Sequence, residues 1–214
     1  VIGGAILSNH PDLDQKLKFL VNSLGTCAQP FDCWLVLRGI KTLGLRFERQ
    51  CANANQVAAW LTKHPSVERV YSPSLPDHPD AEAIGRLFPA GKSSGLVAFE
   101  LKGADKPKIF RFMESLKMIV RATSLGDVHT MILYPAMASH RDLSPKHRER
   151  LGIHDNLVRM SIGIEALEDI LADLHKLSQQ TTAGLYLSAA LINPLIELVA
   201  QRILLGIALQ GVPR

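Results

Sequence analysis

The chain has 214 residues, of which 47% are hydrophobic, 21% charged and 6% aromatic, and its formal net charge is +4. High apolar content with little net charge excludes intrinsic disorder, and 15 Gly and 12 Pro without a fixed period exclude a collagen-like structure. Basic and acidic residues are interspersed along the chain, so we expect no nucleic-acid partner.

The N-terminal residues predict a strand followed by a helix. Val1–Leu7 is a short apolar run that suits a buried strand. A helical pattern then begins at Pro11 or Asp12, with apolar residues at steps of three and four, and Gly25 ends it.

The next pattern predicts the longest helix of the chain. It begins at Asp32 as the N-cap and continues to His64, before a proline. Gly39 and Gly44 weaken this helix and mark a bend or a close contact. A helix of this length exceeds what one small core needs, so we interpret it as a spine that joins one domain to the next.

Beyond this helix, short strands and helices alternate, which predicts an α+β layer with helices on one face of a sheet. The predicted strands are Val67–Tyr71, Leu96–Leu101, Met118–Ala122 and Leu157–Ile162. The predicted helices are Asp80–Phe88, Lys106–Leu116, Pro145–Leu151 and Ala166–Leu177.

The last 32 residues, Ala183–Arg214, form an apolar tail with only three charges, at Glu197, Arg202 and Arg214. Two charges and an Asn-Pro pair within the tail oppose a membrane span. Three interpretations stay open: contact with a membrane, a helix that docks on protein, or an extraneous extension.

The cysteines and histidines do not predict a metal site. Cys27, Cys33 and Cys51 lack paired spacing, and we interpret them as small buried hydrophobic residues in a reducing cytosol. The histidines spaced by seven from His140 to His154 are separated by helix breakers, which favours scattered surface positions.

An arginine interrupts the last predicted strand. Strict alternation places Val158 and Met160 on one face. Leu157, Arg159 and Ser161 then share the other face. A guanidinium in this position needs an acceptor, and a carboxylate held by two hydrogen bonds is the natural partner. That carboxylate belongs either to an internal Asp or Glu or to a ligand, and the pattern leaves both open.

Two hydroxyl residues, Thr123 and Ser124, follow the strand predicted to end at Ala122. Such residues at a strand end are common at binding sites and equally common in plain turns. No glycine-rich nucleotide loop, nucleophile elbow or zinc-protease motif is present in the sequence.

These features occur together, in the same order, in one enzyme family. The matching strings cover residues 1 to about 178. They are V-I-G-G at 1–4, N-S-L-G at 22–25, P-F-D-C-W-L-V-L-R-G-I-K-T-L at 30–43, H-P-S-V-E-R-V-Y at 64–71, A-T-S-L-G-D at 122–127, Y-P-A at 134–136 and L-V-R-M-S-I-G-I-E at 157–165. The chain thus resembles the C-terminal portion of the trans-sulfuration (Cys/Met metabolism) pyridoxal-phosphate enzymes, which include cystathionine γ-lyase, cystathionine γ-synthase and methionine γ-lyase.

The resemblance implies an α/β fold, the C-terminal part of a fold-type I (aspartate aminotransferase-like) enzyme with pyridoxal 5'-phosphate as its cofactor. Residues 1–25 would end the large cofactor-binding domain, and residues 26–64 would form a linker and the long spine helix. Residues 65–178 would form a small C-terminal α+β domain with a mostly antiparallel sheet. Residues 179–214 would be an apolar tail outside the family.

The resemblance also implies roles for three residues. Arg159 would bind the substrate α-carboxylate, and Ser124 would lie near that carboxylate and the reactive lysine. Thr123 stands where many cystathionine-processing members carry Glu. Because of this difference, the resemblance does not determine the leaving group of the substrate. The resemblance implies that the Schiff-base lysine lies in an S-x-T-K segment. None of the eleven lysines of this chain lies in such a segment. We therefore expect the Schiff-base lysine upstream of Val1, and we assign no residue here to the cofactor.

The expected function is that of a carbon–sulfur lyase or γ-replacement enzyme for cysteine- or homocysteine-type amino acids, located in the cytoplasm. Its expected partners are a small amino-acid substrate and either further copies, as a dimer or tetramer, or the missing N-terminal half. The alternative is a non-catalytic interaction or structural module derived from this family, with its tail at a membrane.

Overall fold

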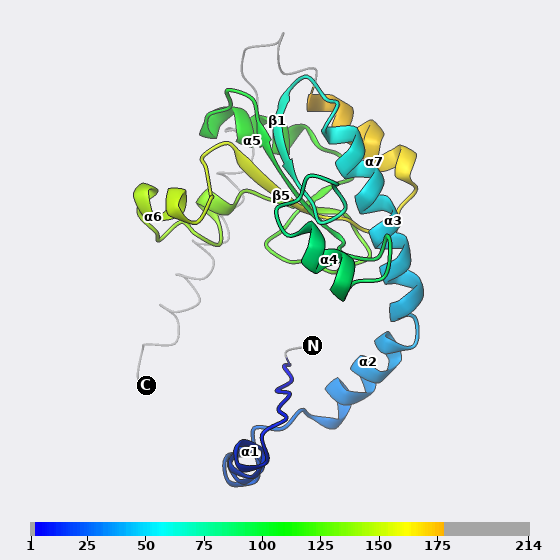
Figure 1. Cartoon of the computed structure of the whole chain (residues 1–214), viewed down its shortest axis with the longest axis vertical. Coiled ribbons are helices and arrows are strands. Elements are labelled where there is room, and N and C mark those ends of the chain that lie inside the picture. The colour runs from blue at the N-terminus through cyan, green and yellow to red at the C-terminus, as the bar shows by residue number, and fades with distance from the viewer. Residues whose placement is uncertain (1–2, 178–214) are drawn as a thin grey trace, which may run out of the picture. The chain divides into compact units, whose positions relative to one another are not determined.

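The computed structural model describes residues 3–177 and contains one mixed sheet (Figure 1). Its five strands lie in the order β1-β2-β5-β4-β3. Every neighbouring pair is antiparallel except β3 and β4, which are parallel, so the prediction of a mostly antiparallel sheet is confirmed. The strands are β1 (Val67–Tyr71), β2 (Leu96–Leu101), β3 (Val120–Arg121), β4 (Met131–Leu133) and β5 (Leu157–Ser161).

The helices of the described part agree with the predicted ones to within a few residues, except in the spine. They are α1 (Pro11–Leu24), α2 (Pro30–Ile40), α3 (Leu43–Leu61), α4 (Ala81–Leu87), α5 (Lys106–Ser115), α6 (Pro145–Arg150) and α7 (Leu167–Leu174), with short 3-10 helices η1 (Pro135–Met137) and η2 (His175–Leu177). Strand β4 was not predicted, because three buried residues are too short a run to show alternation.

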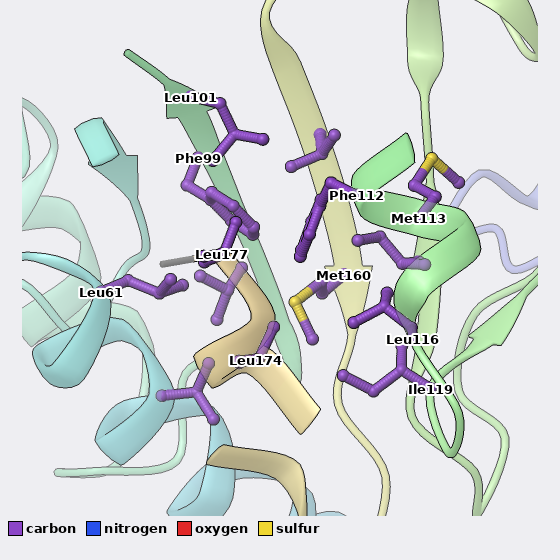
Figure 2. Close-up of a cluster of buried hydrophobic side chains, with 14 of the residues drawn as sticks. Leu61, Phe99, Leu101, Phe112, Met113, Leu116, Ile119, Met160, Leu174 and Leu177 are labelled. Atoms are coloured by element: carbon purple, nitrogen blue, oxygen red, sulfur yellow. The ribbon is translucent and has the colours of Figure 1, made fainter. Parts of the chain in front are cut away.

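The hydrophobic core lies between one face of the sheet and helices α3, α5 and α7. Figure 2 shows Phe112 of α5 and Leu174 of α7 on the same side of the sheet as Phe99 and Met160. Leu61 joins this cluster from α3. The prediction of helices on one sheet face is therefore confirmed, and the opposite face of the sheet is left for other contacts.

The predicted N-terminal strand is wrong for the residues that the structure describes. Residues 3–10 contain no strand and are exposed. The helix that follows is confirmed as α1, and Gly25 ends it in the left-handed conformation with φ 67°. A short apolar run predicts a buried strand only if a neighbouring strand is available for pairing, and none of the described strands pairs with this segment.

The spine is two helices rather than one. Helix α2 begins at Pro30 with Gln29 as its N-cap, so Asp32 lies in the first turn instead of capping it. The helical pattern is interrupted at Thr42, whose φ and ψ of -112° and 5° lie outside the helical region. The carbonyl of Gly39 instead accepts a hydrogen bond from the guanidinium of Arg46 at 2.7 Å. The two glycines thus mark a real break between α2 and α3.

The apolar side chains of α1 and α2 are largely exposed within the described part of the chain. Phe19, Phe31 and Trp34 have exposed fractions of 70%, 67% and 54%. Cys27 and Cys33 are exposed as well, so their interpretation as buried residues is wrong, whereas Cys51 is buried as expected. These surfaces are more apolar than a solvated helix pair requires.

A buried carboxylate, Asp173 of α7, holds the connection between α5 and β3 in place. It accepts hydrogen bonds from the backbone N–H groups of Lys117, Met118 and Ile119 at 3.0–3.1 Å. The ammonium of Lys176 also contacts it. Burial by itself raises the pKa of Asp173, but these donors outweigh burial and lower the pKa to about 2.

Replacement of Asp173 by asparagine is expected to lower the free energy of unfolding by about 2 kcal/mol at pH 7. Because the folded-state pKa lies below the unfolded value, this stabilisation is present above pH 4 and disappears as the pH falls towards 2. Urea unfolding at pH 7 and at pH 2.5 measures it. The exposed Asp169 of the same helix supplies the control, Asp169→Asn. A stability difference between wild type and Asp173→Asn that is equal at both pH values would contradict this account.

The expectations for the apolar tail, and for Val1 and Ile2, lie outside the described residues. Within residues 3–177, no helix is long and apolar enough to cross a membrane, and no three metal-ligating side chains gather into one group.

Candidate substrate-binding site

Arg159 lies in the middle of the sheet, on β5 between β2 and β4. It pairs with Ala98 of β2 and with Leu133 of β4. Its strand neighbours Val158 and Met160 are fully buried in the core, so Arg159 points to the opposite side. The alternation predicted from the sequence is confirmed. We call this side of the sheet the second face; it consists of Arg69, Tyr71, Leu96, Ala98, Glu100, Met131, Leu133, Leu157, Arg159 and Ser161.

The guanidinium of Arg159 is partly exposed, and no residue in the described part of the chain balances its charge. Its Nε atom is buried without a hydrogen bond. Among the described residues, no Asp or Glu forms an ion pair with Arg159. Of the two partners that the sequence left open, this geometry favours a ligand carboxylate.

The turn that contains Ser124 approaches the same strand. The backbone N–H of Gly126 donates to Oγ of Ser161 at 2.9 Å, two residues along β5 from Arg159. Gly126 adopts φ 78°, a conformation that glycine tolerates without strain. The structure therefore brings together the arginine strand and the S-L-G turn, which are more than thirty residues apart in the sequence.

Thr123 and Ser124 are exposed, and within residues 3–177 no hydrogen bond joins either of them to Arg159. Thr123 lines a cavity of about 250 Å³ whose other walls are mainly apolar. Arg159 is not among its lining residues, but its cross-strand partner Leu133 is. This cavity is walled by Phe110 and Met113 of α5, the helix on the core side of the sheet, whereas Arg159 lies on the second face. Among the described residues, the turn is therefore connected to the strand of Arg159 through Gly126 and Ser161 rather than through Thr123.

Two polar residues of α3 fix this region, and neither was predicted from the sequence. The side chain of Gln50 donates to the carbonyl of Asp127 at 2.7 Å. The side chain of Asn53 donates to the carbonyls of Gly163 and Glu165 at 3.2 and 2.9 Å. Both side chains are nearly inaccessible, and amides spaced by three on the buried face of a helix were the available signal.

A second hydrogen-bond network lies at the C-terminal end of β5. The carboxylate of Glu165 accepts from the backbone N–H and the hydroxyl of Thr130 at 2.6 and 2.8 Å. The hydroxyl of Thr130 in turn accepts from the N–H of Gly163 at 2.9 Å. The turn before β4 is therefore bound to the segment after β5, which fixes Ser161 and its neighbours.

A third network, also missed, lies on the second face. Glu100 is 6% exposed, and its Oε1 accepts from the hydroxyl of Tyr71 at 2.8 Å and lies 2.6 Å from Nδ1 of His154. Burial of the phenol and then the Glu100 carboxylate raise the pKa of Tyr71, while the guanidinium of Arg69, 5.0 Å from the ring centroid, opposes them. A glutamate within an otherwise apolar strand was the signal for this network.

Comparison with known proteins finds relatives that share most of the chain. A family model described as Cys/Met metabolism PLP-dependent enzyme matches residues 1–177. Cystathionine beta-lyase of Coxiella burnetii is 42% identical over 178 residues, which is 81% of this chain and 44% of the relative. Cystathionine gamma-lyase of Dictyostelium discoideum is 42% identical over 172 residues, which is 80% of this chain and 43% of the relative.

The fold is shared with a solved enzyme structure. Cystathionine gamma-lyase from Lactobacillus plantarum, complexed with L-serine, superimposes with a TM-score of 0.75 at 34% sequence identity. The match covers 83% of this chain and 46% of that one. The chain thus spans less than half the length of the relatives that it matches.

Proposed function

Because this chain belongs to the Cys/Met metabolism family of pyridoxal-phosphate-dependent enzymes, we propose that it is part of a trans-sulfuration enzyme for cysteine- or homocysteine-type amino acids. The reaction is either cleavage of a carbon–sulfur bond or replacement of the γ-substituent. Pyridoxal 5'-phosphate is the cofactor of this family. When bound, this cofactor acts as an electron sink for the amino acid attached to it.

The unpartnered Nε of Arg159 is the observation that carries this proposal. A partly buried guanidinium without an internal carboxylate is stabilised when an incoming carboxylate accepts two of its hydrogen bonds. The donors on this part of the second face therefore fit the carboxylate end of an amino acid. Binding at that end orients Cα of the substrate, and we assign none of the described residues to the ring or phosphate of the cofactor.

Ser124 and Thr123 are the two further contacts in this proposal. Ser124 lies two residues before Gly126, whose N–H donates to Ser161, and we assign its hydroxyl to the carboxylate site. Thr123 directly precedes Ser124, and we assign it to the side chain of the substrate. A hydroxyl there imposes no charge on the leaving group.

The active unit of this proposal is larger than the 214 residues. The chain spans 44% of a relative's length, and apolar side chains of α1 and α2 such as Phe31 and Trp34 are exposed. We propose that the remainder of such an enzyme, in the same polypeptide or in a separate one, supplies the reactive lysine and covers these side chains. We also propose a homo-oligomer located in the cytoplasm.

The test is turnover by the cofactor-loaded protein. With cysteine, homocysteine or cystathionine, we expect release of sulfide or a thiol together with ammonia and a 2-keto acid. If the 214-residue chain is inactive by itself, addition of a polypeptide that contains the S-x-T-K lysine is expected to restore turnover and the absorbance of bound cofactor. A mixture that shows neither would instead support the non-catalytic module.

A further inference from the structure

The second face places a negative charge beside Arg159. Glu100 of β2 pairs with Leu157, and the next residue pair on this face is Ala98 with Arg159. Glu100 and Arg159 therefore occupy diagonal positions on neighbouring strands. Such positions lie about 7–8 Å apart, within reach of two long side chains. An ion pair between them would occupy the guanidinium that the proposed function assigns to the substrate.

Glu100 is bound elsewhere. Its Oε1 accepts from the hydroxyl of Tyr71 at 2.8 Å and contacts Nδ1 of His154 at 2.6 Å. Tyr71 comes from β1, which lies on the side of β2 away from the strand of Arg159. His154 comes from the segment just before β5. The carboxylate has partners while Nε of Arg159 has none.

We propose that Tyr71 and His154 are positioning residues that hold the Glu100 carboxylate away from Arg159 and so keep the guanidinium available to the α-carboxylate of the substrate. This inference rests on the proposed function, because it presupposes that Arg159 binds that carboxylate. Neither Tyr71 nor His154 touches the substrate. They act by removing an internal competitor.

The competitor is effective because it is tethered in the same sheet. A carboxylate on a neighbouring strand competes at a high effective concentration with a dissolved amino acid. Without Tyr71 and His154, a buried carboxylate would be left unsatisfied, and pairing with a cation relieves that penalty.

Two cations lie next to Glu100 on this face. Arg69 of β1 is the cross-strand partner of Glu100, but Arg69 is exposed, and an ion pair at an exposed site contributes little. Arg159 has a buried donor without a partner, so an ion pair with it gains more. A released Glu100 is therefore expected to turn towards Arg159.

The test is the double variant Tyr71→Phe/His154→Ala in the cofactor-loaded enzyme. We expect KM for the amino acid to rise roughly 10- to 100-fold, the range of one lost charge-assisted interaction, with kcat little changed. Adding Glu100→Gln to this variant is expected to restore KM, because the competing charge is gone. Ser115→Ala is the control, since it removes a side-chain hydrogen bond at another place in the fold, to the carbonyl of Phe112 in α5.

The outcomes separate this inference from the proposed function. If Arg159→Ala leaves KM unchanged, both are overturned. If Arg159→Ala raises KM but the double variant does not, or if Glu100→Gln fails to restore KM, the positioning role alone is overturned. Should the double variant not fold, Tyr71→Phe alone is expected to raise KM by a smaller factor. Glu100→Gln is again expected to cancel that rise, and its failure to do so would overturn the inference.

Discussion

Replacing Arg159 with alanine is expected to lower kcat/KM of the cofactor-loaded enzyme roughly 30- to 4,000-fold, because loss of a partly buried charge pair with the substrate costs about 2–5 kcal/mol. Most of the loss is expected in KM. Because Arg159 has no internal ion-pair partner among residues 3–177, the free energy of unfolding is expected to change little. Steady-state kinetics and urea unfolding of the same preparation measure both effects.

Two further variants sharpen this prediction. Arg159→Lys keeps the positive charge but cannot form bidentate hydrogen bonds with a carboxylate, so a KM between those of wild type and Arg159→Ala is expected. Arg111→Ala removes an exposed arginine of α5 and is expected to leave the kinetics unchanged. An Arg159→Ala enzyme with wild-type KM would show that the carboxylate binds elsewhere. A large loss of stability would instead show that the guanidinium has a structural partner.

The face on which Arg159 lies could be predicted because strand alternation is a local property. Val158 and Met160 are apolar and Arg159 is charged, and the chain need only form a strand for these residues to separate. Gly25 likewise ends α1 through a local backbone conformation. Both features depend on a few consecutive residues, and both were predicted correctly.

The partners of the polar residues could not be predicted, because each belongs to a distant part of the chain. Gln50 binds a carbonyl 77 positions away, and Asn53 binds carbonyls at separations of 110 and 112. Glu100 depends on Tyr71 and His154, which flank it from two different directions. A sequence shows that a buried polar group needs a partner without showing which residue supplies it.

The break in the spine has a different cause. The apolar period continues through residues 41–42, so periodicity alone favours one helix. The interruption depends on a local competition in which Arg46 binds the Gly39 carbonyl that a continuous helix would use. The two glycines were the only signal, and a glycine lowers helix stability without dictating a break.

Gly163→Ala is expected to be the most destabilising small substitution of the candidate site, with a loss of about 1–3 kcal/mol in the free energy of unfolding. A Cβ atom at this position would overlap the carbonyl oxygen of Val128 and the carboxylate of Glu165, and would lie 2.6 Å from the carbonyl carbon of His129. Two of these three neighbours are backbone, which cannot move away as a flexible side chain can. The expected response is separation of the turn at 126–130 from the end of β5.

That separation is expected to affect binding as well as stability. The N–H of Gly163 donates to the hydroxyl of Thr130, and the carbonyl of Val128 accepts from the N–H of Ile164 at 2.9 Å. Both hydrogen bonds would lengthen together. The turn that reaches Ser161 through Gly126 would shift with them, and KM for the amino acid is expected to rise. Gly85→Ala in α4, where nothing lies within 4 Å of the added Cβ, is expected to be neutral or slightly stabilising. If Gly163→Ala unfolds at the same urea concentration as Gly85→Ala, the close backbone approach at the end of β5 is not what holds this site together.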